Sequence, residues 1–100
     1  ATEFIVQNYQ EETLSLSDVA DQVGLSSSHF STTFKQETGK SFVEFLTSVR
    51  MDKAKEMLCF TDMKASQISY EVGYKDPHYF SYLFKKTQGC TPSEYRSRRM

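Results

Sequence analysis

An internal repeat of about fifty residues constrains the fold of this chain more than any other feature. VADQVG at 19–24 matches ISYEVG at 68–73 with an offset of 49, and FSTTFKQETG at 30–39 matches FSYLFKKTQG at 80–89 with an offset of 50. A unit of about fifty residues is therefore present twice. In a chain of 100 residues, this fits one compact domain or two very small ones that share a helix.

The first copy has the pattern of two helices joined by a tight turn. Apolar residues recur at helical spacing over 16–23, behind a capping box formed by Ser15 and Asp18. Gly24 then supplies the positive φ that a tight turn requires, and a second helix is predicted over 27–38. Its inward face is formed by Phe30, Thr33 and Phe34.

The second copy repeats this pattern with one residue added in the turn. Gly73 ends its first helix, and Asp76 caps its second helix with Pro77 at the first helical position. Lys64 stands where the first copy has Ser15, so the first helix of this copy starts with a poor cap. The inward face of the second helix is formed by Phe80, Leu83 and Phe84.

Each copy then opens a third helix with another capping box. Ser41 pairs with Glu44 in the first copy, and Thr91 pairs with Glu94 in the second. The segment 42–59 contains no Gly or Pro, which predicts one continuous connecting helix of roughly 27 Å. Its apolar residues fall on one stripe, formed by Phe42, Phe45, Leu46, Val49, Met57 and Leu58.

The predicted fold class is therefore all-α, with two helix-turn-helix units joined by a long connecting helix. The predicted organisation is a first helix-turn-helix subdomain over 1–41, the connecting helix over 42–59 and a second helix-turn-helix subdomain over 60–100. The connecting helix has a length of the order of one DNA turn, which is about 34 Å. It could therefore set two recognition helices along one side of a duplex.

The charge of the chain is distributed unevenly. Although the formal net charge is −1, residues 1–25 hold five acids and no Lys or Arg, whereas residues 26–100 hold twelve bases and eight acids. A net charge near zero argues against a nonspecific polyanion binder. The basic surplus nevertheless lies in the part of the chain that carries both predicted recognition helices.

The outward faces of these two helices follow from the inward ones by helix geometry. Short polar side chains let a helix lie deep in a DNA groove, and hydroxyls bond base edges or phosphates. A helix face that is merely solvated has the same composition. The occurrence of this polar face at the same positions in both copies favours DNA binding. The predicted base-contacting residues are Ser28, Ser31 and Thr32 in the first copy and His78, Ser81 and Tyr82 in the second.

Basic residues that flank the recognition helices are candidates for phosphate contacts. The candidates are Lys35, Lys40, Lys85, Lys86 and Arg96, together with Arg98 and Arg99 at the end of the chain. Backbone N–H groups at the helix starts capped by Ser41 and Thr91 form a second kind of phosphate site. The alternative for each of these lysines is that it is a solvated surface residue without a phosphate contact.

Other functional classes find little support in the sequence. Cys59 and Cys90 have no CxxC or CxxH partner, which argues against a metal centre, and no spacing builds a nucleotide or cofactor site. A cysteine enzyme such as a DNA-repair alkyltransferase would need an activating neighbour that neither cysteine has. No apolar run approaches the roughly 18 residues of a membrane span, so we expect a cytoplasmic protein. The alternative from another class is a helical protein-interaction module that does not bind DNA.

The two repeated segments, VADQVGLSSSHFSTTFKQETGKSFVEFL and ISYEVGYKDPHYFSYLFKKTQGCTPSEYR, closely resemble the AraC/XylS family of bacterial transcription regulators. This resemblance implies an all-α domain of about seven helices, whose two recognition helices enter successive major-groove segments of double-stranded DNA. It assigns base contacts to the six residues named above. Family members often have Arg or Gln where this chain has Thr32 and Tyr82. The resemblance also implies a preceding sensor, effector-binding or receiver domain, and RNA polymerase is a candidate partner.

Overall fold

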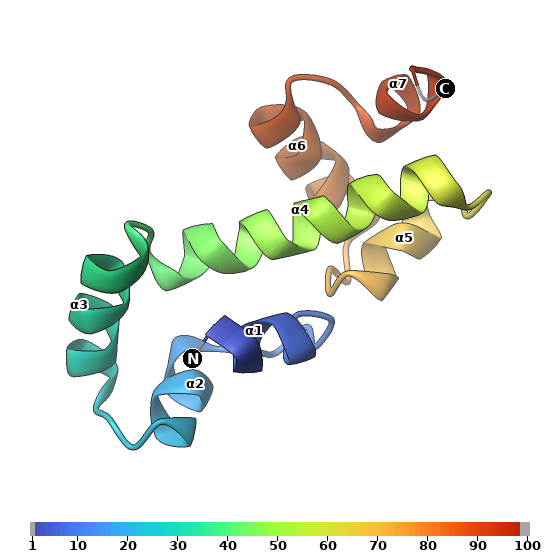
Figure 1. Cartoon of the computed structure of the whole chain (residues 1–100). Coiled ribbons are helices and arrows are strands. Elements are labelled where there is room, and N and C mark those ends of the chain that lie inside the picture. The colour runs from blue at the N-terminus through green and yellow to red at the C-terminus, as the bar shows by residue number, and fades with distance from the viewer. Residues whose placement is uncertain (1, 99–100) are drawn as a thin grey trace.

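The computed structural model describes residues 2–98, and within this range the protein consists of seven α-helices and no strands. The helices are α1 (Thr2–Asn8), α2 (Leu16–Gln22), α3 (Ser27–Thr38), α4 (Phe42–Phe60), α5 (Ala65–Glu71), α6 (Pro77–Gln88) and α7 (Pro92–Ser97). The molecule measures 43 × 22 × 21 Å. Helix α4 runs along its centre, with α2 and α3 at one end and α5, α6 and α7 at the other (Figure 1). The predicted all-α fold is confirmed.

The helix starts are formed by the predicted caps. Ser15 Oγ accepts a hydrogen bond from the Asp18 N–H, and the Asp18 carboxylate accepts one from the Ser15 N–H. The Asp76 carboxylate accepts from the His78 N–H, with Pro77 as the first residue of α6. Lys64, by contrast, makes no side-chain cap bond at the start of α5. The first helix-turn-helix is thus better capped than the second, as predicted.

Two hydrophobic cores lie at the two ends of α4. The first core consists of Ile5, Val19, Ala20, Phe30, Phe34, Phe42 and Leu46. The second core consists of Met51, Ala54, Leu58, Ile68, Val72, Tyr74, Phe80 and Phe84. Half-buried Tyr9, which follows α1, packs against both cores. Each subdomain therefore uses part of α4 as a wall of its own core.

Helix α4 presents different faces to the two cores, so the prediction of a single apolar stripe was wrong in part. Phe42 and Leu46 are buried in the first core, whereas Met51 and Ala54 are buried in the second. At 100° per residue these two pairs point in different directions. Of the predicted stripe, only Phe42, Leu46 and Leu58 are buried, while Phe45, Val49 and Met57 are half-buried. The helix also extends to Phe60, one residue beyond the predicted 59.

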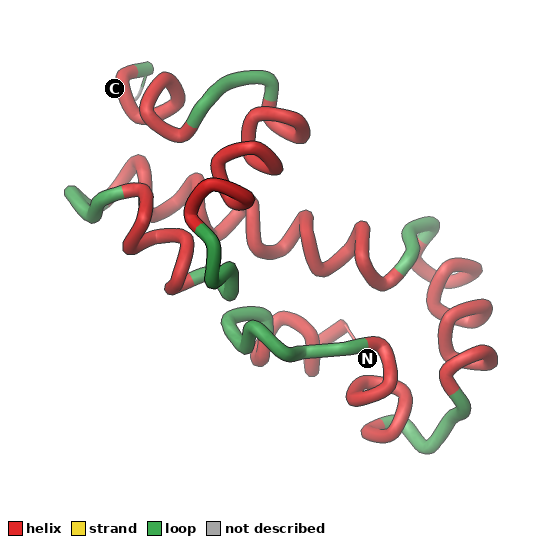
Figure 2. Tube along the Cα trace, turned by 180° about the vertical axis from the view of Figure 1, so that it is seen from behind, coloured by secondary structure: helices red, strands yellow, loops and turns green. Residues whose placement is uncertain are grey.

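Helix α1 had no sequence signal, and it brings the start of the chain under the middle of α4 (Figure 1). The loop that follows α1 lies beside the turn between α5 and α6 in both views (Figure 2). Ile5 is fully buried in the first core. None of the helices within residues 2–98 is both long enough and apolar enough to cross a membrane.

Candidate nucleic-acid interface

Helix α3 has a buried aromatic face and an exposed polar face. Phe30 and Phe34 are buried with their ring centroids 5.3 Å apart, and they fix the helix against the first core. The exposed side chains on the other face are Ser28, Ser31, Thr32 and Lys35. The Thr32 hydroxyl donates to the Ser28 carbonyl oxygen at 3.1 Å, so it is engaged within the helix. The predicted base-contacting residues of the first copy thus share one accessible surface.

Helix α6 repeats this arrangement with bulkier exposed residues. Phe80 and Phe84 are fully buried, with ring centroids 5.9 Å apart. On the opposite face His78, Tyr82 and Lys85 are exposed and Ser81 is half-buried. Tyr82 is 61% exposed, and Lys86 Nζ lies 5.9 Å from the centroid of its ring. A large aromatic side chain that is held in the open by a helix is available to contact an outside partner.

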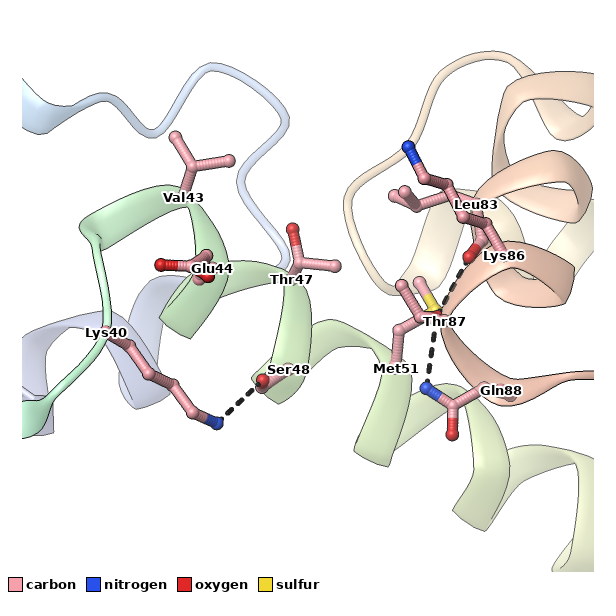
Figure 3. A pocket seen from close by; sticks show the side chains of 10 residues that line it. All are labelled: Lys40, Val43, Glu44, Thr47, Ser48, Met51, Leu83, Lys86, Thr87 and Gln88. Carbon is pink, nitrogen blue, oxygen red and sulfur yellow. Dashed lines mark hydrogen bonds between the residues drawn. The ribbon is translucent and has the colours of Figure 1, made fainter.

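A hollow of about 550 Å³ separates the two subdomains between α4 and α6 (Figure 3). Lys40 stands on one side of the hollow, where its Nζ donates to Ser48 Oγ at 3.2 Å, and Lys86 stands on the other (Figure 3). Exposed Val43 and half-buried Thr47 lie between them on α4. Two positive charges therefore flank the gap between α3 and α6.

The lysines predicted to contact phosphate are exposed, but Arg96 has a different environment. Lys35, Lys40, Lys85 and Lys86 are all accessible to solvent, as is Arg98. Arg96 is half-buried, and its Nε and Nη2 donate to the carbonyl oxygens of Leu58 and Thr61 at 3.2 and 3.1 Å. These bonds hold α7 to the end of α4, so we remove Arg96 from the proposed phosphate contacts. Arg99 lies outside the described residues.

The helix starts at Ser41 and Thr91 are closed by capping boxes. The Ser41 N–H donates to Glu44 Oε1 at 2.9 Å, and the Thr91 N–H donates to Glu94 Oε1 at 2.8 Å. These backbone bonds, followed by the bonds to the Ser41 and Thr91 side chains, hold the pKa of each carboxyl below its ordinary value. Both glutamates are therefore ionised at neutral pH. A phosphate at either helix start would meet a carboxylate beside it.

Within residues 2–98 no group of three or more His, Cys, Asp or Glu side chains is placed to hold a metal ion. Cys90 is buried, whereas Cys59 is half-buried on α4. The side chains that the structure does gather on exposed helix faces are hydroxyls, an imidazole, a phenol and lysines. These groups form hydrogen bonds and bind anions.

Two turn-linked helix pairs, each with an exposed polar second helix, define a double helix-turn-helix DNA-binding domain. A family model described as a helix-turn-helix domain matches residues 19–98. The chain belongs to the AraC/XylS family of transcription regulators, as its sequence resemblance implied. Proteins of this family regulate transcription.

Individual relatives give the extent of the similarity. The chain is 43% identical over 96 residues to the lactose operon transcription activator of Staphylococcus xylosus, which covers 96% of this chain and 34% of that protein. It is 34% identical over 97 residues to the arabinose operon regulatory protein of Escherichia coli K12, covering 97% and 33%. The solved C-terminal domain of AraT, a response regulator from Geobacillus stearothermophilus, matches with a TM-score of 0.96 at 39% identity, covering 99% and 82%. The chain spans about a third of the length of the two curated relatives.

Proposed function

We propose that this domain binds double-stranded DNA sequence-specifically, with α3 and α6 in adjacent segments of the major groove, and thereby regulates bacterial transcription. The observation that carries the proposal is the pair of exposed polar helix faces at the two ends of α4. The 19 residues of α4 span roughly 28 Å, which is close to the 34 Å of one DNA turn. One protein could therefore occupy two successive major-groove segments on the same side of a duplex.

The side chains on these faces divide into two roles. Ser28, Ser31 and Thr32 on α3 and His78, Ser81 and Tyr82 on α6 contact base edges through hydrogen bonds and apolar surface. Lys35, Lys40, Lys85 and Lys86 contact phosphates. The first amides of α4 and α7, after Ser41 and Thr91, are weaker phosphate sites because Glu44 and Glu94 lie beside them. The DNA backbone between the two major-groove segments passes over the hollow that lies between Lys40 and Lys86.

The full-length protein carries a further domain before this one that senses a signal, binds an effector or receives a phosphoryl group. Curated relatives three times the length of this chain support that view. The regulator acts in the cytoplasm, and RNA polymerase is a candidate partner. A helical protein-interaction module remains the competing hypothesis, but most large apolar side chains of α3 and α6 are already used in the two cores.

Selection from a pool of random duplexes, followed by footprinting, tests the proposal. We expect the domain to protect two base clusters about 10 bp apart, and inserting 5 bp between them should place the clusters on opposite sides of the duplex and abolish joint protection. A double variant, Lys85→Ala with Lys86→Ala, is the control for phosphate contacts and should weaken binding to every duplex similarly. A single protected cluster, or a footprint that tolerates the insertion, would contradict the proposal.

A further inference from the structure

A buried arginine at the middle of α4 contacts both subdomains. Arg50 is only 6% exposed. Its Nε donates to the Tyr9 carbonyl oxygen and its Nη2 to the Glu11 carbonyl oxygen, each at 2.9 Å. Its guanidinium carbon lies 4.9 Å from the ring centroid of Tyr74, which belongs to the second core. A buried guanidinium is costly unless its donors are satisfied, and here both bonds go to the loop after α1.

Gly73 brings the second subdomain against the same point. A Cβ at this residue would lie 2.8 Å from the Tyr9 carbonyl oxygen and 2.9 Å from Arg50 Nε. Gly24, the equivalent residue of the first copy, also has a positive φ, but a Cβ there would meet nothing within 4 Å. The crowding at Gly73 is therefore not a requirement of the helix-turn-helix turn. It arises because the other subdomain lies against it.

We propose that Arg50 is a positioning residue that fixes the orientation of α3 relative to α6 and so sets the spacing of DNA contacts that the domain accepts. This proposal rests on the proposed function. We call the contact of Arg50 with Tyr9, Glu11, Gly73 and Tyr74 the Arg50 clamp. It lies where the buried face of α4 changes from one core to the other.

A single helix is an insufficient link for this purpose. Helix α4 is a rod of roughly 28 Å, so a bend of only about 2° at one end moves the other end by about 1 Å. Hydrogen bonds to base edges tolerate only a few tenths of an ångström in length. A second attachment away from the axis of α4 opposes such bending, and the Arg50 clamp supplies one between the loop after α1 and the turn after α5.

The chain offers a matched control for this arginine. Arg96 also donates from Nε and Nη2 to two backbone carbonyl oxygens, those of Leu58 and Thr61. Its partners lie at the end of α4, next to the second core only. Replacement of Arg96 therefore removes the same type of bidentate bond without touching the first subdomain. Lys cannot reproduce either geometry, because its ammonium is a point donor and not a planar fork.

Residual dipolar couplings of the backbone amides test the clamp without DNA. In the wild-type domain the couplings of both subdomains should fit one alignment tensor. In Arg50→Met the tensors of the two subdomains should differ in magnitude, whereas in Arg96→Met a single tensor should still fit. A single tensor for Arg50→Met would overturn the proposal. If Arg50→Met does not fold, Arg50→Lys, which keeps the charge, replaces it under the same criteria.

The second experiment measures spacing preference on a duplex that the wild-type domain selects from a random pool. Inserting 1 or 2 bp between the two base clusters should lower wild-type affinity about tenfold or more, and Arg50→Met should bind the original duplex about tenfold more weakly while losing most of this spacing penalty. Arg96→Met should keep the penalty. An unchanged penalty in Arg50→Met contradicts the proposal. If the wild-type domain selects no duplex, the proposed function fails, and the dipolar couplings still decide the role of Arg50.

Discussion

The two subdomains share a scaffold and differ in what they expose. Phe30 and Phe34 of the first have the same positions as Phe80 and Phe84 of the second, and all four are buried. The surfaces around them have opposite charge. Residues 1–41 hold two lysines and six acids, a net charge of −4, whereas residues 60–100 hold seven bases and four acids, a net charge of +3. A repeat can therefore keep its core while its two copies take different parts in binding.

The exposed faces of α3 and α6 also differ in the side chains that they present. Helix α3 presents small hydroxyl side chains, while α6 presents an imidazole and the phenol of Tyr82, a residue that is 61% exposed. We infer that the second subdomain supplies most of the nonspecific attraction to DNA, because charge neutralisation dominates that term. The first subdomain then adds less to this attraction, and both recognition helices contribute to sequence preference. The following predictions test this division and the structural differences that accompany it.

The largest difference is expected at the two turn glycines. Gly73→Ala should destabilise the domain by more than about 3 kcal/mol, because strain at φ +103° adds to overlap with the Tyr9 carbonyl. Gly24→Ala should cost only about 1–2 kcal/mol, the strain of a left-handed alanine in open space. Urea unfolding, monitored by circular dichroism, measures the loss of stability in both variants. Equal losses would show that the turn alone, and not the neighbouring subdomain, requires glycine at position 73.

The two recognition helices should differ in binding energy. Tyr82→Ala and Thr32→Ala should each weaken binding at particular base positions by about 1–3 kcal/mol, with Tyr82 toward the upper end because its ring offers more contact area. Titration of single-base variants of the selected duplex gives these values. Lys85→Ala is the control, and it should weaken all duplexes alike and reduce the salt slope by about 1. An equal loss of affinity for all duplexes in Tyr82→Ala would show that Tyr82 contacts the DNA backbone or stabilises the fold, and does not contact bases.

The caps of α2 and α5 offer a smaller contrast. Ser15→Ala should lower stability by about 1 kcal/mol, and Lys64→Ser should raise it by up to about 1 kcal/mol. Gln67 stands three residues after Lys64, so a serine at position 64 completes the pattern of a capping box. Lys64→Ala removes the charge without adding a hydroxyl, and it should not stabilise. Thermal unfolding of the three variants measures the effect, and a gain in Lys64→Ala equal to that in Lys64→Ser would exclude capping as its cause.

The smallest effect concerns pH, and here the two copies should agree. Hydrogen bonds from the Ser41 and Thr91 backbones lower the pKa of Glu44 and of Glu94 below the ordinary 4.5. A depressed folded-state pKa adds stability above pH 4.5 that is lost as the pH falls through the folded value. Glu44→Gln and Glu94→Gln should each lower the urea midpoint slightly at pH 7 and approach the wild type at pH 3. A difference that persists at pH 3 would show that lost packing, not lost charge, is its source.

The sequence predicted the repeated elements well because their signals are local. Caps, turn glycines and apolar spacing placed α2, α3, α4 and α6, and the start of α7, within a residue or two. The capping boxes at Ser15, Ser41 and Thr91 all form as expected. The exposed faces of α3 and α6 followed from the positions of the buried phenylalanines. Their contacts with DNA remain predictions.

What the sequence did not predict depends on contacts between distant segments. Arg50 is a charged residue of the kind that usually lies at the surface. Nothing near it in the chain indicates that the Tyr9 and Glu11 carbonyl oxygens lie 2.9 Å from its guanidinium nitrogens. Arg96 likewise has its partners 35 and 38 residues earlier in the chain. A hydropathy pattern assigns charged residues to the surface, so a buried arginine whose partners are backbone carbonyls gives no signal. The change of buried face along α4 was missed for the same reason.

The sharing of α4 has a consequence for how the domain unfolds. The first core takes Phe42 and Leu46 from this helix, and the second takes Met51, Ala54 and Leu58. If α4 melts at either end, it exposes apolar surface of that core, and Tyr9 couples the loss to the other core. The domain should therefore behave as one cooperative unit, with the slowest amide hydrogen exchange in the middle of α4 and similar protection in α3 and α6. Neither half of the chain should persist as a folded intermediate after the other has opened.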